Sequence, residues 1–558
     1  MLKTLFYIVM CSLIAVTTLC EEYNTAEIVS DSTTLYVEIN DGSKLYKEMK
    51  TTGVWQLFLS KEWQAFFQTM PSEIFEATTK IREEIESKLD SSLSDAVMSF
   101  SGHMSIAVDN NFNISISWDL GNQKEKIISS LKKLYIENVP GANILVHKVN
   151  DHNVYELVAT NSKSAFYSVV ENTLLTSTDK DFFAKAFTKQ VKNSLADLPM
   201  YQNIKKKTIK EKDGAFLYVN PTSIIEWAEK SLGKHVASIM KTMGVNSIQS
   251  LGAGLYFENG QVVETLQVYM PERHGLLKEI IPTTTASRSL EKFIPQNLIS
   301  LHHGYINLKS TKDIFYKILN DFSPNTYNEF IKTEQQINDQ LGINIDEALA
   351  DLGTEYLFTI SFSNGLLPDV ALQLSLTNLE KFKSLLNKIS QAIPENTCYN
   401  SKWNGYEINY FQIFSLNNFI PVSPTYIISD DRVLFTLFPE SVKNLIVQKN
   451  GHFPKDLEQL LKNVRYTNVQ YLNLQKLVIP VYSTVVPLVQ AIVPRSYVPI
   501  DFTLLPDATT LEKYLENSVQ VFAADSEGLS VKFYSPFGVY ILPIISKILS
   551  MDFKIEDN

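Results

Sequence analysis

The residues whose types could do chemistry are few and dispersed. His147 and His152, with Asp151 beside them, have the side chains of a metal site, but their setting between two expected strands is typical of a hairpin turn, the interpretation we prefer. His302 and His303 are adjacent in an expected strand, so their side chains point to opposite faces and cannot bind one ion together. Neither pair of histidines therefore predicts a metal site.

Two further patterns could hold a ligand. Asp430 and Asp431 carry carboxylates suited to acid–base chemistry or calcium, but they lie between two apolar runs, where a tight turn explains them. Gly252 and Gly254 form a fragment of a phosphate-binding pattern, but they lie inside an expected strand, where a bulge or close packing explains them. The sequence contains no HExxH, CxxC or GxSxG motif. We therefore predict no catalytic, metal or cofactor-binding residue.

Aromatic residues gather in one helical pattern near the N-terminus, at Trp55, Trp63, Phe66 and Phe67. Packing in a core is the default interpretation of such a stripe. If the stripe were exposed, it would instead form a groove for an apolar ligand, a peptide or another protein.

Composition narrows the class of protein. The 558 residues are 45% hydrophobic and 20% charged, as in ordinary globular chains, and the length suggests several domains. With 50 basic and 61 acidic side chains, the net charge of −11 argues against nucleic acid as a partner.

Residues 1–20 have the pattern of an export signal. Lys3 supplies a positive charge, and an apolar run from Leu5 to Leu19 follows it. Cleavage after Cys20 would leave Cys398 as the sole cysteine and exclude an intrachain disulfide, which favours a bacterial periplasm or envelope. The alternative is a lipid anchor at Cys20, but the residues before it match a bacterial lipobox poorly.

A second apolar run, from Leu477 to Pro494, is long enough to suggest a membrane span. Pro480, Pro487 and Pro494 would leave backbone groups unpaired in hydrocarbon. We therefore predict a buried, kinked helix and no transmembrane helix in the mature chain.

Two stretches of the chain repeat one another at a spacing of 256 residues. In both, aliphatic residues at every fourth position are followed by alternating apolar residues, which predicts a helix and then a strand. We expect the helical residues to be buried in both copies, so that cutting Ile85 or Leu341 to Ala costs about 2–5 kcal/mol. The matched positions are Ile81 and Ile337, Ile85 and Leu341, Leu89 and Ile345, Leu93 and Leu349, and Ile114, Ile116 and Trp118 with Val370, Leu372 and Leu374.

Later matches extend the repeat through the rest of each half: Tyr155–Glu156 with Tyr406–Glu407, Tyr167 with Tyr426, Leu175 with Leu434, and Tyr269–Pro271 with Tyr534–Pro536. We predict an α+β protein of two homologous halves, residues 21–285 and 286–558, each with antiparallel sheets flanked by helices. Asn220, Asn307 and Asn473 each follow an apolar strand and precede a helical pattern, so we expect them to cap helices and not to bind a ligand.

The order of these parts resembles a set of large exported bacterial proteins grouped as a domain of unknown function. The resemblance rests on the signal, the doubled half, Asp351-Leu-Gly before one apolar strand and Pro368-Asp369 before the next. It covers most of the mature chain and implies location and architecture, and it carries over no catalytic residue.

Duplication without a catalytic constellation predicts a non-catalytic envelope protein, a scaffold or binding module. Its expected contact surface is the cleft between the halves, and the expected partner is a protein, a peptide or an apolar ligand. The alternative is an exported hydrolase whose catalytic residues are dispersed. Screening for turnover of ester, peptide and glycoside substrates would separate the two.

The first testable consequence concerns the N-terminus. If the signal is removed without lipidation, mass spectrometry of the mature protein will find Glu21 as the first residue. A diacylated Cys20 would refute this prediction.

Overall fold

The computed structural model describes residues 25–69 and 102–538, apart from short gaps at 122–123, 126, 130–131, 133–140, 142, 159–163, 189–192, 210–213, 232, 282–285, 287–288, 363–367, 393–396, 413–421, 449–450 and 493–500. Ile81, Ile85, Leu89 and Leu93 lie outside these residues, as do the signal and the joint expected near residue 285.

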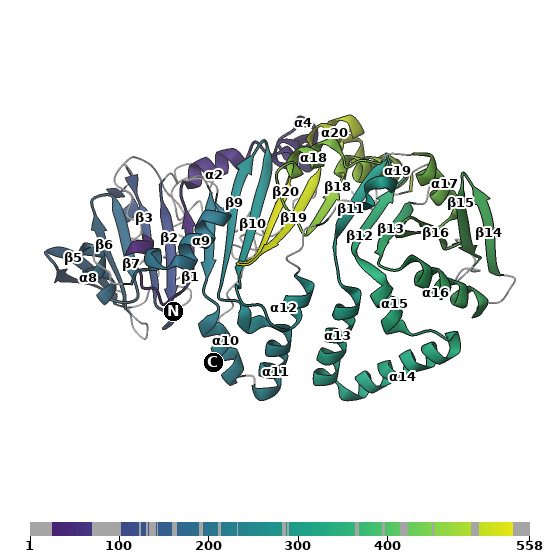
Figure 1. Cartoon of the computed structure of the whole chain (residues 1–558). Helices are drawn as coiled ribbons and strands as arrows, with labels where there is room; N and C mark the ends of the chain where they lie inside the picture. Colours follow the sequence, from purple (N-terminus) through teal and green to yellow (C-terminus); the bar gives the residue numbers. More distant parts are fainter. Residues whose placement is uncertain are drawn as a thin grey trace.

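Twenty strands form one antiparallel sheet (Figure 1). The first ten are β1 (Thr33–Ile39), β2 (Met104–Asp109), β3 (Ile114–Asp119), β4 (Asn143–Val149), β5 (His152–Val158), β6 (Ala165–Val170), β7 (Thr173–Ser177), β8 (Ala215–Val219), β9 (Ser250–Glu258) and β10 (Gln261–Tyr269). The second ten are β11 (Leu298–Tyr305), β12 (Leu352–Ser361), β13 (Asp369–Leu376), β14 (Cys398–Trp403), β15 (Tyr406–Phe411), β16 (Thr425–Ser429), β17 (Arg432–Thr436), β18 (Asn468–Leu472), β19 (Ser518–Asp525) and β20 (Gly528–Ser535).

The order of pairing in the first ten strands recurs in the second ten. From the outer edge inward, the first set runs β4-β5-β6-β7-β3-β2-β1-β8-β9-β10. The second runs β14-β15-β16-β17-β13-β12-β11-β18-β19-β20. The predicted α+β class is confirmed. Common ancestry of the two halves stays a prediction, since a shared topology does not by itself establish it.

β10 and β20 pair with each other and join the two sets into one sheet. Their ladder runs from Val262 opposite Ser535 to Tyr269 opposite Gly528. Because these strands bond directly, the sheet is continuous from β4 to β14.

Helices line the two long edges of the sheet at which its strands begin and end (Figure 1). One edge carries α10 (Thr222–Ser231), α11 (Gly233–Met243), α12 (Gly275–Ile280), α13 (Leu308–Phe322), α14 (Pro324–Leu341) and α15 (Ile345–Asp351). The other carries α2 (Gly42–Met49), α3 (Gly53–Phe58), α4 (Lys61–Gln68), α18 (Lys455–Leu461), α19 (Leu474–Ile492) and α20 (Ala508–Tyr514). Helices α8 (Asp181–Thr188), α9 (Pro199–Thr208), α16 (Leu379–Ala392) and α17 (Pro439–Val447) belong to the loops between strands.

The two halves also exchange helix contacts. α3 of the first half packs against α20 of the second, and α13 of the second packs against α11 and α12 of the first. One contact lies on each side of the β10–β20 ladder, and both hold the halves together.

Two of the three expected caps are present, and Asn220 instead forms a turn one residue before the cap position of α10. Asn307 caps α13, with its side chain accepting from Ser310 N at 3.0 Å, and Asn473 accepts from Lys476 N at 2.8 Å at the start of α19. Asn220 accepts from Thr222 N at 3.1 Å.

The expected burial of the second helical stripe is wrong. Ile337 is 38% exposed, Leu341 and Ile345 are only half-buried, and none of the residues of α14 is buried. α14 packs on α13 and α16 along one side and has no second layer of described residues over it. The fourfold spacing therefore marked a helix and not a core position.

The register of the strands gives a better pair of equivalent core positions. Leu175 in β7 pairs with Ser117 in β3, and Leu434 in β17 pairs with Gln373 in β13, which keeps the 256-residue spacing between β3 and β13. Leu175 is fully buried and Leu434 is 1% exposed. The expected match of Tyr155 with Tyr406 is three residues out of register, since their hairpin turns lie at 150–151 and 404–405.

We expect Leu175→Ala and Leu434→Ala each to lower the free energy of unfolding by about 2–5 kcal/mol, because both remove buried methyl groups and leave a cavity. Val447→Ala, at a position that is 60% exposed, should change it by less than about 0.5 kcal/mol. Denaturant titrations of the three variants would check this. A loss at only one of the two leucines would contradict their equivalence.

Candidate functional site

The side chains of His147 and His152 do not converge. The β4–β5 hairpin turns at Asn150 and Asp151, both with positive φ, so the predicted turn is confirmed. His147 Nε2 lies 2.6 Å from Glu156 Oε2 across the hairpin, whereas the ring of His152 packs against Phe187. Among the residues that the structure describes, no cluster of three or more His, Cys, Asp or Glu side chains could hold a metal ion.

The acidic pair and the glycines also have structural roles. Asp430 and Asp431 form the two-residue turn between β16 and β17, where Asp430 contacts exposed Lys292. Gly254 lies inside β9, and a Cβ there would come within 2.5 Å of the Thr208 carbonyl of α9. The tight-turn and close-packing interpretations are confirmed.

The aromatic residues lie on two helices, not on one, because Ser60 caps α4 and separates it from α3. Phe66 is buried and lies 6.3 Å, between ring centroids, from Phe502, while Trp63 stacks on Phe67 at 5.2 Å. Of the four residues only Phe66 is buried, whereas Trp55, Trp63 and Phe67 are half-buried, so the core interpretation holds for Phe66 alone.

A buried carboxylate–histidine pair that the sequence search missed lies in the first half. Glu38 in β1 is 4% exposed and accepts from Lys205 Nζ at 2.7 Å and from Tyr36 at 3.1 Å. His103 Nε2 lies 3.7 Å from the same carboxylate, too long for a hydrogen bond but close enough for electrostatic attraction. Burial would raise the pKa of Glu38, but His103 and Lys205 outweigh it and lower the pKa to about 2.

The second half carries the same pair with the two residue types exchanged. His303 in β11 is fully buried, its Nε2 lies 2.8 Å from Glu355 Oε1, and its Nδ1 lies 3.1 Å from the hydroxyl of Tyr466. In the β1–β2 ladder Glu38 lies opposite Ser105, and its partner His103 precedes Ser105 by two residues. In the β11–β12 ladder His303 lies opposite Leu357, and its partner Glu355 precedes Leu357 by two residues. A charged residue inside an apolar strand was the available sequence signal for Glu38.

A cavity of about 340 Å³ lies where the halves meet. Asn517 Nδ2 donates to Asp456 Oδ2 at 2.6 Å, and Gln261 of the first half donates to the Asn517 carbonyl at 3.2 Å. The Asn517 Oδ1 atom is buried without a hydrogen-bond partner among the described residues. The lining residues are Gln261, Asp456, Leu460, Gln475, Leu515, Glu516, Asn517 and Val519.

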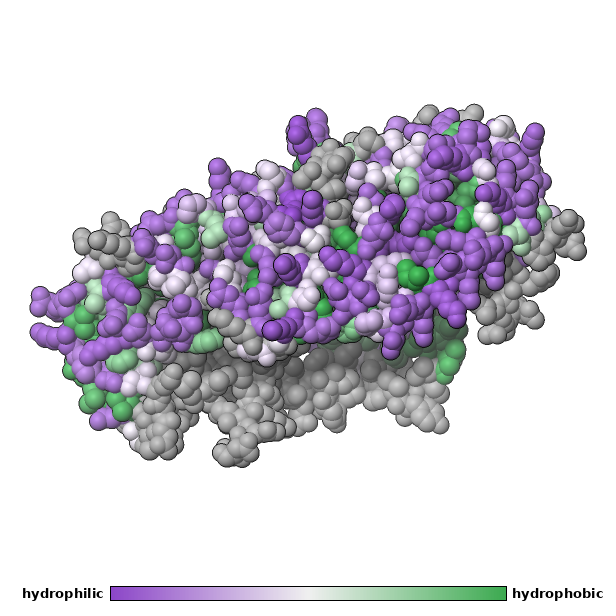
Figure 2. All heavy atoms as spheres, turned by 60° about the horizontal axis from the view of Figure 1, so that its bottom comes forward, coloured by the Kyte–Doolittle hydropathy of each residue, from purple (hydrophilic) through white to green (hydrophobic). Residues whose placement is uncertain are grey.

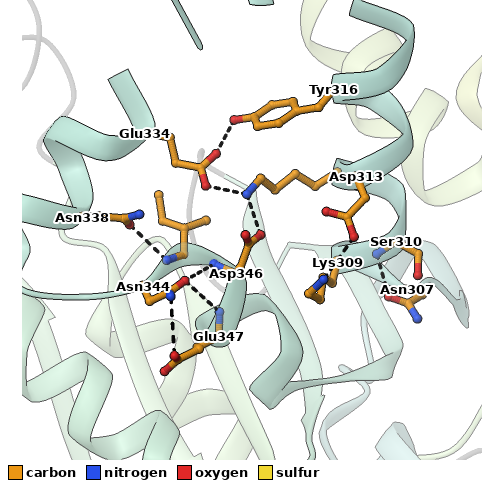
Figure 3. A network of polar contacts seen from close by, with 12 residues as sticks. Asn307, Lys309, Ser310, Asp313, Tyr316, Glu334, Asn338, Asn344, Asp346 and Glu347 are labelled. Carbon is orange, nitrogen blue, oxygen red and sulfur yellow. Dashed lines mark hydrogen bonds and ion pairs between the residues drawn. The ribbon is translucent and has the colours of Figure 1, made fainter. Parts of the chain in front are cut away.

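A polar network fastens α13, α14 and α15 together (Figure 3). Lys312 Nζ lies between Glu334 Oε1 at 2.5 Å and Asp346 Oδ1 at 2.6 Å, and Tyr316 donates to the same Glu334. Burial would lower the pKa of Lys312, but Asp346 and Glu334 raise it above its usual value. Since these three helices contain no buried residue, the network holds them together where no apolar core does so.

The outer face of α19 is the largest departure from expectation. The helix continues through Pro480 and Pro487 as predicted, but its burial was predicted wrongly. It is the one described helix long and apolar enough to cross a membrane by length and composition, with a mean hydropathy of 1.2, and none of that window is buried. Its exposed aliphatic residues recur at helical spacing: Leu477 (38%), Val481 (52%), Val485 (46%), Leu488 (55%) and Ile492 (66%).

The opposite side of α19 is fixed to the protein. Leu474 is buried against Leu57 and Leu511, with Val478 and Ile479 packed beside them. Gln490 Nε2 donates to the Phe502 carbonyl at 3.0 Å, and the hydroxyl of Tyr482 donates to the Pro506 carbonyl. Among the described residues, the helix is therefore held along one side and exposed along the other.

The edge with α10–α15 differs from this face. Figure 2 turns that edge toward the viewer and shows a mainly hydrophilic surface on which apolar side chains form small separate patches. Phe322, at 68%, is the most exposed aromatic residue of α13. A continuous aliphatic stripe along one helix is thus a property of α19.

Comparison with known proteins adds little. No protein-family model and no curated protein matches the chain. Among solved structures, crystal forms I and III of TP0453 are 9% and 10% identical to it; each match covers 44% of this chain and 78% or 79% of that one, with TM-scores of 0.22 and 0.20. Likeness at this level supports no statement about fold or function.

We expect stability to fall in acid because of Glu38. Its pKa is about 2 in the folded protein against an ordinary 4.5, so roughly 3 kcal/mol of stability is present above pH 4.5 and is lost as the pH falls from there toward 2. Glu38→Gln should remove this dependence and destabilise the protein at pH 7 by a similar amount. Denaturant titration between pH 2 and 7 checks it, with Asp313→Asn at an exposed ion pair as the control. An unchanged acid limb in Glu38→Gln would contradict the assignment.

Proposed function

We propose that this chain is an exported, non-catalytic protein of a bacterial envelope that acts as a binding module, with the outer face of α19 as its binding surface. The observation that carries the proposal is the exposed stripe from Leu477 to Ile492 on a helix whose other side is fixed. A contiguous apolar patch of a few hundred Å² is often functional even on an ordinary monomer. The signal pattern of residues 1–20 supports export.

We also propose that the halves arose by duplication. The recurring order of strand pairing and the exchanged Glu38–His103 and His303–Glu355 pairs support this origin. The halves are joined by the β10–β20 ladder. The cleft expected between them is therefore reduced to the cavity of about 340 Å³ lined by Gln261 and Asn517, here called the seam cavity.

The alternative is an exported hydrolase, and the seam cavity is the observation that favours it. Asp456 and Glu516 are both among the residues that line the cavity, and carboxylates are the residue type that glycoside hydrolysis requires. Asp456 already accepts a hydrogen bond from Asn517. Turnover of a glycoside, ester or peptide that Asp456→Asn or Glu516→Gln abolishes would overturn the binding-module proposal.

The binding role predicts a loss of association when the stripe is made polar. The variant Val481→Ser/Val485→Ser/Leu488→Ser should lose binding in a thermal-shift screen of lipids and peptides and in pull-downs from envelope extracts, because the apolar area is removed. The variant Val447→Ser/Val464→Ser changes comparably exposed valines elsewhere and serves as the control. Equal binding by the two variants, or no ligand for the unmodified protein, would count against the proposal.

A further inference from the structure

We propose that the partner of α19 is the interface of a lipid bilayer, and that the helix lies flat in that interface. This inference rests on the proposed function, since it names the occupant of the same face. Three properties of the face lead to a bilayer: its area, its chemistry and its attachment.

The exposed area is too small for a stable protein partner. Five aliphatic side chains exposed by 38–66% leave a few hundred Å² of apolar surface, within the about 300–600 Å² of the largest patch on an ordinary monomer. Each partner in a standard stable protein interface buries about 800 Å². A second copy of this chain, docked through α19 alone, would therefore not form a stable dimer.

The chemistry of the face is aliphatic and uncharged. Between Leu477 and Pro494 the sequence contains no Asp, Glu, Lys or Arg. Protein interfaces depend on aromatic and arginine anchors for affinity, and the exposed stripe supplies neither. A hydrocarbon boundary requires only apolar area.

The attachment of the helix decides its orientation. α19 has 19 residues, about 28 Å at 1.5 Å per residue, which is close to the thickness of a hydrocarbon core. Its inner side packs against Leu57 and Leu511 and is held through Tyr482 and Gln490. Since only the outer side is free, the helix inserts sideways to a shallow depth and does not span the bilayer.

The short helix η7 (Phe502–Leu504) contacts α19 on its held side, where Gln490 donates to the Phe502 carbonyl. Figure 1 shows α19 on the same side of the molecule as α18 and α20.

Charge makes the inference specific. The face carries no charge and the whole chain carries −11, so attraction to anionic lipid contributes nothing and repulsion opposes it. Binding should therefore occur on zwitterionic vesicles, should not weaken between 50 and 500 mM salt, and should be no stronger on anionic vesicles.

The experiment is co-flotation of the full mature chain with phosphatidylcholine vesicles, with and without one-third phosphatidylglycerol. We expect the unmodified protein to float with both, and Val481→Ser/Val485→Ser/Leu488→Ser to partition at least tenfold less because three aliphatic side chains are lost. Val481→Leu/Val485→Leu/Leu488→Ile keeps the face apolar and should float as well as the unmodified protein. Circular dichroism and the melting temperature of each variant establish that it is folded.

The outcomes separate this inference from the proposed function. If the unmodified protein stays with neither vesicle, or binds only anionic vesicles at low salt, the bilayer inference is wrong. The unmodified protein could instead bind no vesicle but bind a peptide or a protein, or self-associate in sedimentation. If only the serine variant loses that binding, the face binds a protein and the proposed function stands. If the serine variant floats like the unmodified protein, α19 is not the membrane contact.

Discussion

The antiparallel pairing of β10 with β20 is the constraint on which the rest of the structure depends. Without it each half would expose an unpaired strand edge, which is a template for aggregation. Gly528 fixes one end of the ladder: its φ is +155°, and a Cβ there would meet the Val268 carbonyl at 1.9 Å. Across the same seam, Lys207 of α9 forms ion pairs with Asp525 and Glu527 at the β19–β20 turn. The helices that cross between halves can pack only because this ladder sets the spacing of the strands from which they emerge.

The sequence predicted the elements well and their surroundings less well. Alternating apolar residues located β3 and β13, and Leu175 and Leu434 kept the predicted correspondence because each pairs with the strand next to it. Periodicity of this kind is set locally, by one face meeting the core. The predicted turns at Asp151 and Asp430 were also local, and both are confirmed by positive φ.

Burial could not be predicted where it depends on a neighbour far along the chain. Ile337 has the spacing of a core residue, yet α14 has a packed side and an open side among the described residues. The Glu38 network was missed for the same reason, since its partners His103 and Lys205 are brought together by two strands and a helix distant in sequence. A single carboxylate among apolar residues gives no sign of which cations will meet it.

Among the described residues, the helices beside the exposed face of α19 are shorter than α19 itself. In the corresponding place of the first half, after β8, α10 has 10 residues and packs against α11, which has 11. α19 has 19 residues, but the helices described beside it, α3 and α20, have 6 and 7. At 1.5 Å per residue these span about 9–11 Å of a helix of about 28 Å, and η7 holds the helix near its C-terminus through Gln490 and Phe502. Along its exposed side, interrupted by Ser483 and Thr484, α19 keeps aliphatic residues to its last turn, whereas α14 places more polar residues between its apolar positions.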